Sequence, residues 1–262
     1  MNDRRRALVT GGGKRLGRAM ALYLASRGYD VAVHYNTSST AADEVAQDIC
    51  ARGQAACTLG ADLLDEAATT ALVGRATDAL GGAPDVLVNN ASIFEYDTLA
   101  DATRDTWDRH MGSNLRAPFV LTQAMARVAR DPVTDTNGEP RARSLVVNMI
   151  DQRVRKPTPE FMTYTLAKMA LWAFTQTAAQ ALAPRVRINA IGPGPTLRGG
   201  RQDATAFARQ RAATILERGA NPDDIVAALG YFLDAPAVTG QLLCVDGGQH
   251  LAWQTADVLG VE

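Results

Sequence analysis

The sequence predicts an α/β protein built on a doubly wound, mainly parallel sheet. Short apolar runs alternate with stretches of helical periodicity along most of the 262 residues. The first apolar run leads directly into a glycine-rich turn, residues 11–17, and then into the first helical stretch. A helix between two strands returns the chain to the same end of the sheet, so strands connected in this way run parallel. No linker or change of composition divides the chain, and we expect a single domain over residues 1–262.

Seven apolar segments are the expected strands of this sheet. They span residues 6–10, 29–36, 54–60, 85–89, 144–150 and 185–191, with the last strand starting at residue 242. The helical segments between them are residues 18–27, 41–52, 65–80, 104–130, 163–183 and 225–233. This alternation places helices on both faces of the sheet.

Three segments do not fit the strand and helix pattern. Residues 131–143 are polar and contain proline and glycine, which favours an exposed loop. Residues 197–219 have helical spacing without a strong apolar face, as expected of a lid over a substrate. Residues 249–262 form a C-terminal tail with no assigned role.

Composition excludes several classes of function. A net charge of −1 argues against a nucleic-acid partner, which would require a basic surface. No apolar run approaches the length of a membrane span. The three cysteines, Cys50, Cys57 and Cys244, contain no C-x-x-C pair and are expected to be reduced and partly buried in a cytoplasmic protein. We expect no metal site, and a small-molecule substrate.

Tyr164 and Lys168 are the first candidate catalytic pair. Their spacing of four residues puts both side chains on one face of the predicted helix. A nearby ammonium favours the phenolate, so we expect the phenol pKa to fall toward the working pH, where acid-base catalysis is efficient. The alternative is a helix with one surface lysine and one half-buried tyrosine.

The turn after the first strand is a candidate cofactor site. Glycines such as Gly11 and Gly17 allow the backbone to approach a phosphate closely, and the following helix N-terminus supplies oriented N–H groups. A plain tight turn is the alternative. The second strand ends without the Asp or Glu that would hold the ribose hydroxyls of NAD. His34, Asn36 and Ser38 stand there instead, and Arg15 supplies a charge for the extra phosphate of NADP, unless it only caps a surface turn.

Polar residues also follow other strands, where a doubly wound sheet binds its ligand. Asp62 follows the third strand and could bond an adenine amino group or cap a helix. Phe94 follows the fourth strand, where its ring could stack on a flat ligand or pack beneath the loop. Asn114, inside the long helix predicted over residues 104–130, could order a proton path or kink the helix. Asp151 follows the fifth strand.

Several motifs together resemble the short-chain dehydrogenase/reductase family in order and spacing. They are Thr10-Gly11 with Gly17, Asn89-Asn90-Ala91, Asn114, Tyr164-x-x-x-Lys168, Pro193-Gly194, and Thr239-Gly240 with Val245-Asp246-Gly247-Gly248. The resemblance implies a single-domain Rossmann fold and a nicotinamide cofactor. It implies Tyr164 as proton donor, Lys168 on the nicotinamide ribose and Asn114 in a water-linked proton relay. It also implies a homotetramer with interfaces at helices 104–130 and 163–183 and at residues 242–253.

Two departures from the general family pattern resemble its pteridine reductase branch. Arg15 stands where a second glycine is usual, and Asp151 where the catalytic serine is usual. By this resemblance Phe94 stacks a pterin, with Ser92 and Arg15 nearby, and NADPH is expected in preference to NADH. The cofactor residues expected are Gly11, Arg15, Leu16, Gly17, His34, Asn36, Ser38, Asp62, Leu63, Asn90, Ala91, Lys168, Pro193 and Gly194.

The chemistry of Asp151 supports a C=N substrate. An ionised carboxylate would repel the alkoxide that forms on a carbonyl, whereas it could relay a proton to a nitrogen or accept a bond from an amino-pyrimidine edge. Asp151 could instead cap the next turn or pair with Arg153 or Arg155. The leading hypothesis is an NADPH-dependent reductase of pterins or dihydrofolate. The alternatives are a carbonyl or alcohol oxidoreductase acting on another small substrate, and a cofactor-binding protein without catalysis.

Overall fold

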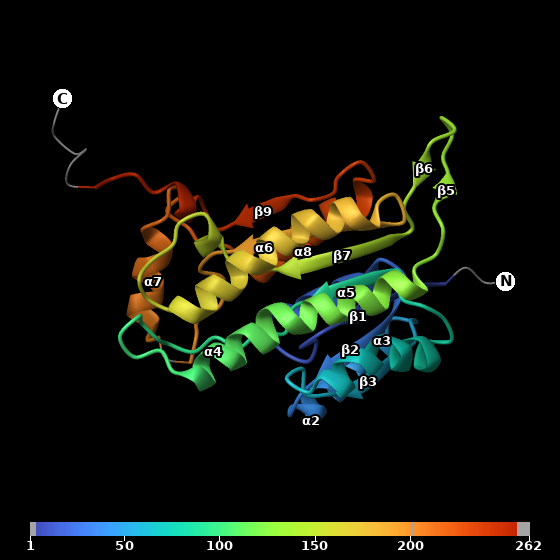
Figure 1. Cartoon of the computed structure of the whole chain (residues 1–262), viewed down its shortest axis with the longest axis horizontal. Helices are drawn as coiled ribbons and strands as arrows, with labels where there is room; N and C mark the ends of the chain where they lie inside the picture. Colours follow the sequence, from blue (N-terminus) through green and yellow to red (C-terminus); the bar gives the residue numbers. More distant parts are fainter. Residues whose placement is uncertain (1–3, 201, 256–262) are drawn as a thin grey trace.

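The core of the protein is a sheet of seven parallel strands, seen in the computed structural model of Figure 1, which describes residues 4–200 and 202–255. The spatial order is β3-β2-β1-β4-β7-β8-β9. The strands are β1 (Arg5–Val9), β2 (Tyr29–Tyr35), β3 (Ala56–Gly60), β4 (Val86–Asn89), β7 (Ser144–Met149), β8 (Val186–Pro193) and β9 (Leu242–Val245). The predicted doubly wound Rossmann-type sheet is confirmed.

Helices cover both faces of this sheet. One face packs against α1 (Arg15–Ser26), α2 (Ser39–Cys50) and α8 (Pro222–Asp234), and the other against α3 (Glu66–Leu80), α5 (Ala117–Val128) and α6 (Met162–Leu182). Alternation along β1 explains the two cores: Ala7 and Val9 join the first, and Leu8 between them joins the second. The inner strands β2, β4 and β7 are therefore buried on both sides, which requires the continuous apolar runs seen in the sequence, whereas the edge strands β3 and β9 are only partly buried.

The helix predicted over residues 104–130 is broken in the structure. It consists of α4 (Arg104–Met111), a π-helical turn η1 (Gly112–Arg116) and α5, which ends at Val128. Pro118 has no N–H to donate to the carbonyl of Asn114, and its ring crowds that carbonyl. The wider turn relieves this conflict and contains Asn114, as π-turns at functional sites often do.

The segment predicted as a plain loop over residues 131–143 forms a short hairpin, β5 (Val133–Thr134) with β6 (Pro140–Arg141), which projects from the body in Figure 1. Its turn uses Gly138 at φ 81°. Within the predicted lid, α7 (Ala204–Ala212) has no buried residue, and residue 201 lies outside the described residues. The tail predicted over 249–262 is described only to residue 255, with a 3-10 turn at Gln249–Leu251.

The order of the strands reverses between β1 and β4, which pair through Leu8 and Leu87. Crevices at such a switch point, beyond the carboxyl ends of the strands, are where open α/β sheets bind ligands. Within the described ranges, no helix combines the length and apolar character needed to cross a bilayer. The cysteines are unpaired, and Cys50 is exposed, contrary to the expected partial burial.

Candidate active site

The turn between β1 and α1 is held against the loop after β4. Asn90 Nδ2 donates to the carbonyl oxygens of Thr10 (2.8 Å) and Gly11 (3.2 Å), and the Thr10 hydroxyl accepts from the N–H groups of Asn90 and Ala91. A Cβ on Gly17 would collide with the Gly11 carbonyl and lie 2.7 Å from Asn90 Nδ2. This close packing leaves no room for a side chain at Gly17 and brings the backbone of the turn to the cavity wall, as a phosphate-binding turn requires.

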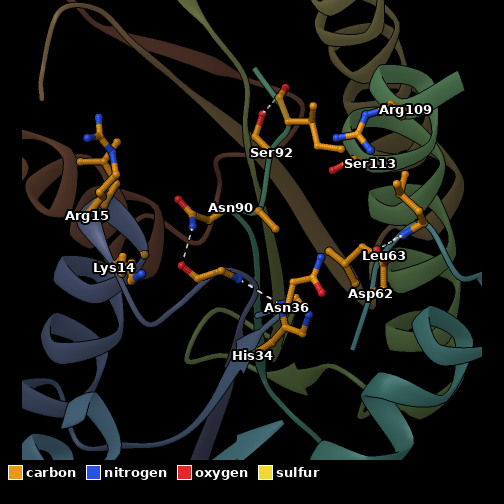
Figure 2. Close-up of a pocket in the computed structure, with 16 residues that line it drawn as sticks. Lys14, Arg15, His34, Asn36, Asp62, Leu63, Asn90, Ser92, Arg109 and Ser113 are labelled. Carbon is orange, nitrogen blue, oxygen red and sulfur yellow. Dashed lines mark hydrogen bonds between the residues drawn. The ribbon is translucent and has the colours of Figure 1, made fainter. Parts of the chain in front are cut away.

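A cavity of about 520 Å³ lies beside this turn. In Figure 2, Lys14 and Arg15 come from the start of α1, Arg109 and Ser113 come from the opposite helical segment, and Asn90 lies between them. The predicted cofactor residues on its wall are Gly11, Arg15, Leu16, Gly17, His34, Asn36, Asp62, Leu63, Asn90 and Ala91. The structure thus brings together most of the residues expected at the nucleotide half of a cofactor.

His34 has a role that the sequence did not indicate. It is 1% exposed, its Nδ1 accepts from Gly11 N–H at 3.0 Å, and its Nε2 donates to the Ala61 carbonyl at 3.0 Å. Burial lowers the pKa of this imidazole, which keeps it neutral. With both nitrogens engaged, His34 holds the glycine turn on the cavity wall and has no further N–H to donate to a 2′-phosphate, so its expected place beside that phosphate stays a prediction.

Of the other cofactor residues predicted after β2 and β3, Asn36 and Asp62 line the first cavity and Ser38 does not. Asn36 is exposed on the cavity wall, whereas Ser38 is the N-cap residue of α2 and is not among the lining residues of the described chain. Asp62 accepts from Leu64 N–H at 2.9 Å, and the N-cap of α3 is Asp65. The helix-cap alternative for Asp62 is therefore wrong, and its carboxylate remains on the wall of the cavity.

Asp151, Tyr164 and Lys168 meet in a second cavity of about 860 Å³. The Tyr164 hydroxyl donates to Asp151 Oδ2 at 3.0 Å, and Lys168 Nζ donates to the Met149 carbonyl at 2.8 Å. Asp151 Oδ1 accepts from Arg153 N–H at 2.8 Å, so one carboxylate both caps the turn after β7 and contacts the phenol. The predicted catalytic pair and the substituted aspartate form one group of side chains.

Burial controls the protonation of this group. It raises the pKa of the Asp151 carboxyl, and it lowers the pKa of the Lys168 ammonium to about 8. The pKa of Tyr164 is raised well above its ordinary value, first by burial and then by the adjacent Asp151 charge. The expected lowering of the phenol pKa by Lys168 is therefore wrong, because burial and the adjacent Asp151 both disfavour the phenolate.

Phe94 lies over this group at the end of the loop after β4. Its ring centroid is 4.7 Å from that of Tyr164, edge to face, and 4.3 Å from Phe161, with which it stacks at an angle of 7°. The guanidinium of Arg153 covers the Phe161 ring at 4.9 Å. Phe94 is 47% exposed and lines the cavity, which excludes packing beneath the loop and leaves a flat aromatic surface beside the phenol.

Asn114 contacts the loop that leads to Phe94. Its Oδ1 accepts from Ile93 N–H at 3.0 Å and from the Ser92 hydroxyl at 3.0 Å, and its Nδ2 donates to the Ile93 carbonyl at 2.8 Å. The side chain is fully buried and satisfies these groups from within the π-helical turn. Asn114 therefore orders the loop after β4, and its proposed place in a proton relay stays a prediction.

The two cavities share Arg15, Leu16, Asn90 and Ser92. Arg15 has a positive φ of 53°, and its guanidinium donates to the carbonyls of Leu197 and Arg198 at 3.0 and 2.9 Å. It thereby connects the glycine turn to the start of the predicted lid, instead of capping a surface turn. Pro193 and Gly194 at the end of β8 line the larger cavity, as expected.

Sequence reasoning did not place Lys14 or Phe161 at the site, and it considered Arg153 only as a partner of Asp151. Lys14 lines the first cavity next to Arg15, and Phe161 and Arg153 line the second. Lys14 is detectable as a cation within the glycine turn. Phe161 offers no such signal, because its left-handed backbone (φ 55°) and its stack on Phe94 depend on contacts between distant segments.

Comparison with known proteins agrees with this geometry. The profile of the family described as Enoyl-(Acyl carrier protein) reductase matches residues 13–250. An uncharacterized oxidoreductase of Mycobacterium tuberculosis is 37% identical over 94% of this chain and 92% of its own length, and pteridine reductase 1 of Leishmania tarentolae is 32% identical over 94% and 96%. The crystal structure of FolM alternative dihydrofolate reductase 1 from Brucella suis, in complex with NADP, aligns over 98% of this chain and 99% of its own, with 42% identity and a TM-score of 0.90.

The matches extend over almost the whole chain, and the family profile covers residues 13–250, a range that contains Tyr164 and Lys168. The sheet order and the switch-point crevice described above have the arrangement of the same fold. The chain belongs to the short-chain dehydrogenase/reductase family of oxidoreductases.

Proposed function

We propose that this protein is an NADPH-dependent reductase that transfers hydride to a C=N bond of a pterin or dihydrofolate. The observation that carries the proposal is the hydrogen bond from the Tyr164 hydroxyl to Asp151 Oδ2. The similarity to FolM from Brucella suis and to pteridine reductase 1 of Leishmania tarentolae supports the same substrate class. A pterin is a flat ring system with hydrogen-bond donors and acceptors at its edge, and this cavity offers matching groups.

The proposed chemistry assigns a proton to Tyr164 and a relay or anchor to Asp151. NADPH, when bound, supplies the hydride to the carbon of the C=N bond. The nitrogen then requires a proton, which the Tyr164 hydroxyl donates, and the Asp151 carboxyl relays a proton to that hydroxyl or bonds the amino-pyrimidine edge. Lys168, an ammonium below its pKa of about 8, holds the nicotinamide ribose and offsets the negative charge left on the phenol.

The cofactor preference follows from charge at the end of β2. Lys14 and Arg15 line the first cavity, and Asn36 occupies the position after the strand where NAD enzymes carry an acidic residue. The residues present fit a phosphorylated ribose, since no carboxylate stands at the carboxyl end of β2 to repel it. We therefore propose NADPH as the cofactor, with NADH bound less tightly.

Phe94 is the proposed platform for the substrate. Its exposed ring forms part of the larger cavity beside Tyr164, and a pterin stacked on it would bring its edge to Asp151. Ser92 and Arg15 are the polar groups proposed near the substrate and the cofactor phosphates. The segment over residues 197–219, with α7 on the cavity wall, is the proposed lid.

The test is the rate of NADPH oxidation with dihydrobiopterin, dihydromonapterin and dihydrofolate, beside a panel of ketones. Turnover of the pterins or dihydrofolate, with a lower kcat/KM for NADH, is the expected result. Tyr164→Phe should abolish turnover while leaving NADPH affinity unchanged. Turnover of ketones alone would assign the protein to carbonyl reduction, and cofactor binding without turnover of any substrate would contradict catalysis.

We further propose a cytoplasmic homotetramer. Large apolar side chains are exposed on the segments expected at interfaces: Trp107 (43%), Leu166 (39%), Leu251 (60%) and Trp253 (56%). Burial of such groups between copies would remove apolar area from water. Unpaired cysteines and a reduced nicotinamide cofactor suit a reducing compartment. Light scattering that gives a monomer at micromolar concentration would contradict the assembly.

A further inference from the structure

A buried polar network lies behind the proposed substrate platform and proton donor. His110, on α4, is fully buried, and Asp97 and Thr163 are each 2% exposed. His110 Nδ1 lies 2.6 Å from Thr163 Oγ1, and Glu95 N–H donates to His110 Nε2 at 3.1 Å. The Thr163 hydroxyl in turn donates to Asp97 Oδ2. These groups connect α4, the loop after β4 and the start of α6.

The hydrogen bonds determine where each proton lies. A backbone N–H can only donate, so His110 Nε2 is an unprotonated acceptor. A neutral imidazole then carries its proton on Nδ1, which donates to Thr163 Oγ1, and the Thr163 hydroxyl proton goes to the Asp97 carboxylate. Each donor in this series of hydrogen bonds has one acceptor. A second proton on His110 would face the Glu95 N–H and break the network.

Asp97 also supplies the cap that α6 lacks. The N-cap residue Phe161 makes no side-chain cap bond, and its backbone is left-handed. Asp97 instead accepts from Thr163 N–H through Oδ1 at 3.2 Å, and its carbonyl accepts from Met162 N–H at 3.3 Å. The first turn of α6, which carries Tyr164, is therefore fixed by a residue of the loop after β4.

The network bonds the immediate neighbours of both active aromatic groups. Glu95 follows Phe94, and Thr163 precedes Tyr164. The His110 ring also meets the Tyr164 ring edge to face, with centroids 6.0 Å apart. The rigid imidazole of His110 thus connects Glu95, which follows Phe94, to Thr163, which precedes Tyr164.

We propose that His110 is a positioning residue that sets the distance and angle between Phe94 and Tyr164, acting through Glu95 N–H and the Thr163 hydroxyl. The inference rests on the proposed function only for the identity of the substrate that stacks on Phe94. Its catalytic effect follows because hydride and proton transfer need the substrate held within about an ångström of the productive position, and such misplacement costs on the order of a hundredfold in rate.

The helix offers a matched pair of variants on either side of Tyr164. Thr163→Val removes the hydroxyl that joins His110 to Asp97. Thr165→Val makes the same change at a buried threonine whose Oγ1 has no hydrogen-bond partner in the described structure. We expect Thr163→Val and His110→Phe to lower kcat at least about tenfold with NADPH affinity unchanged, and Thr165→Val to leave both unchanged. Thr163→Ser keeps the hydroxyl and should have the kcat of the unsubstituted protein. The double variant that combines Thr163→Val with His110→Phe should lose no more kcat than either single variant, because both remove the same network.

Two measurements need no substrate and decide the case if pterins are not turned over. The first of them is made on the unsubstituted protein and therefore also decides the case if these variants fold poorly. The sequence has three histidines, so ¹⁵N-histidine labelling gives few imidazole signals. At neutral pH, His110 should be the Nδ1–H tautomer, while His34, whose Nδ1 accepts from Gly11 and whose Nε2 donates to Ala61, serves as the Nε2–H reference. A crystal structure of Thr163→Val should show a separation of the Phe94 and Tyr164 rings different from 4.7 Å.

The outcomes separate this inference from the proposed function. Absence of pterin turnover by the unsubstituted protein counts against the function alone, and the kinetic comparison then uses the ketone that it does reduce. A His110 that is an Nε2–H tautomer or an imidazolium overturns the inference. So does a Thr163→Val protein with a lower melting temperature but unchanged kcat, because that result shows a structural role only.

Discussion

The hydroxyl of Tyr164 donates a hydrogen bond of 3.0 Å to Oδ2 of Asp151, so the proposed proton donor contacts a carboxylate directly. Asp151 belongs to the turn after β7 and Tyr164 to α6, and the Arg153 N–H fixes the other carboxylate oxygen at 2.8 Å. The arrangement retains the proton on the phenol, because burial and the neighbouring charge both raise the Tyr164 pKa. It is suited to protonating a nitrogen and poorly suited to stabilising an alkoxide.

Asp151→Asn should lower the Tyr164 pKa relative to the unsubstituted protein, because the negative charge that raises it is removed. Pterin turnover should fall by about a hundredfold or more, the usual effect of losing an acid-base group. Asp151→Ser is the matched variant and should favour ketones over pterins. Spectrophotometric titration and kcat measure the two effects, and unchanged pterin turnover in Asp151→Asn would remove the carboxylate from the mechanism.

The rate should depend on the protonation of Lys168. Burial lowers its pKa to about 8, so the group is an ammonium below that pH and neutral above it. We expect kcat/KM, which reports the free enzyme, to decline as pH rises through about 8. Lys168→Arg, if active, should lose this decline because a guanidinium stays charged. A flat profile of the unsubstituted protein to pH 10 would contradict the assignment.

The same shift predicts a change of stability with pH. The unfolded lysine has the ordinary pKa of 10.5, and the folded one about 8, so between these values the unfolded chain binds more protons. The free energy of unfolding should therefore increase from pH 8 to 10.5 through this group, whereas the cost of the buried ammonium is fully present below pH 8. Denaturant unfolding at several pH values, for the unsubstituted protein and for Lys168→Met, isolates the contribution of this lysine. The same change of unfolding free energy with pH in both proteins would contradict the prediction.

Gly17→Ala should destabilise the glycine turn and weaken NADPH binding severely. The added Cβ would collide with the Gly11 backbone carbonyl and with the Asn90 side chain, which hydrogen bonds to Thr10 and Gly11 hold in place. Gly74→Ala in α3 is the control, since nothing lies within 4 Å of its Cβ, and it should stabilise by about 0.5–1 kcal/mol through helix propensity. Cofactor titration and thermal unfolding give both values, and wild-type affinity in Gly17→Ala would show that the turn adapts.

Much of the fold and of the site was predictable because it depends on local pattern. Apolar strands followed by helices predicted the seven-stranded sheet and both helical layers. The spacing of Tyr164 and Lys168 placed both on α6, and the positions of Asn90 and Asp151 after strands placed them at the crevice. Periodicity indicates which face of a helix or strand a residue occupies, and the end of an apolar run indicates which residues follow a strand. In a parallel sheet the carboxyl ends of the strands lie at one edge, so the residues that follow them come together there.

Tertiary structure alone decided how these groups act on one another. Lys14, Phe161 and the buried imidazole of His110 reach the site only when α1, α4 and α6 pack together. The Tyr164 pKa rises because packing removes the phenol from water beside Asp151, which spacing along the chain does not encode. Sequence by itself determined the fold, the family and the candidate residues, since these follow from short-range pattern and composition. Hydrogen-bond partners, tautomers and pKa shifts depend on distances between segments far apart in the chain, and those distances exist only in the folded protein.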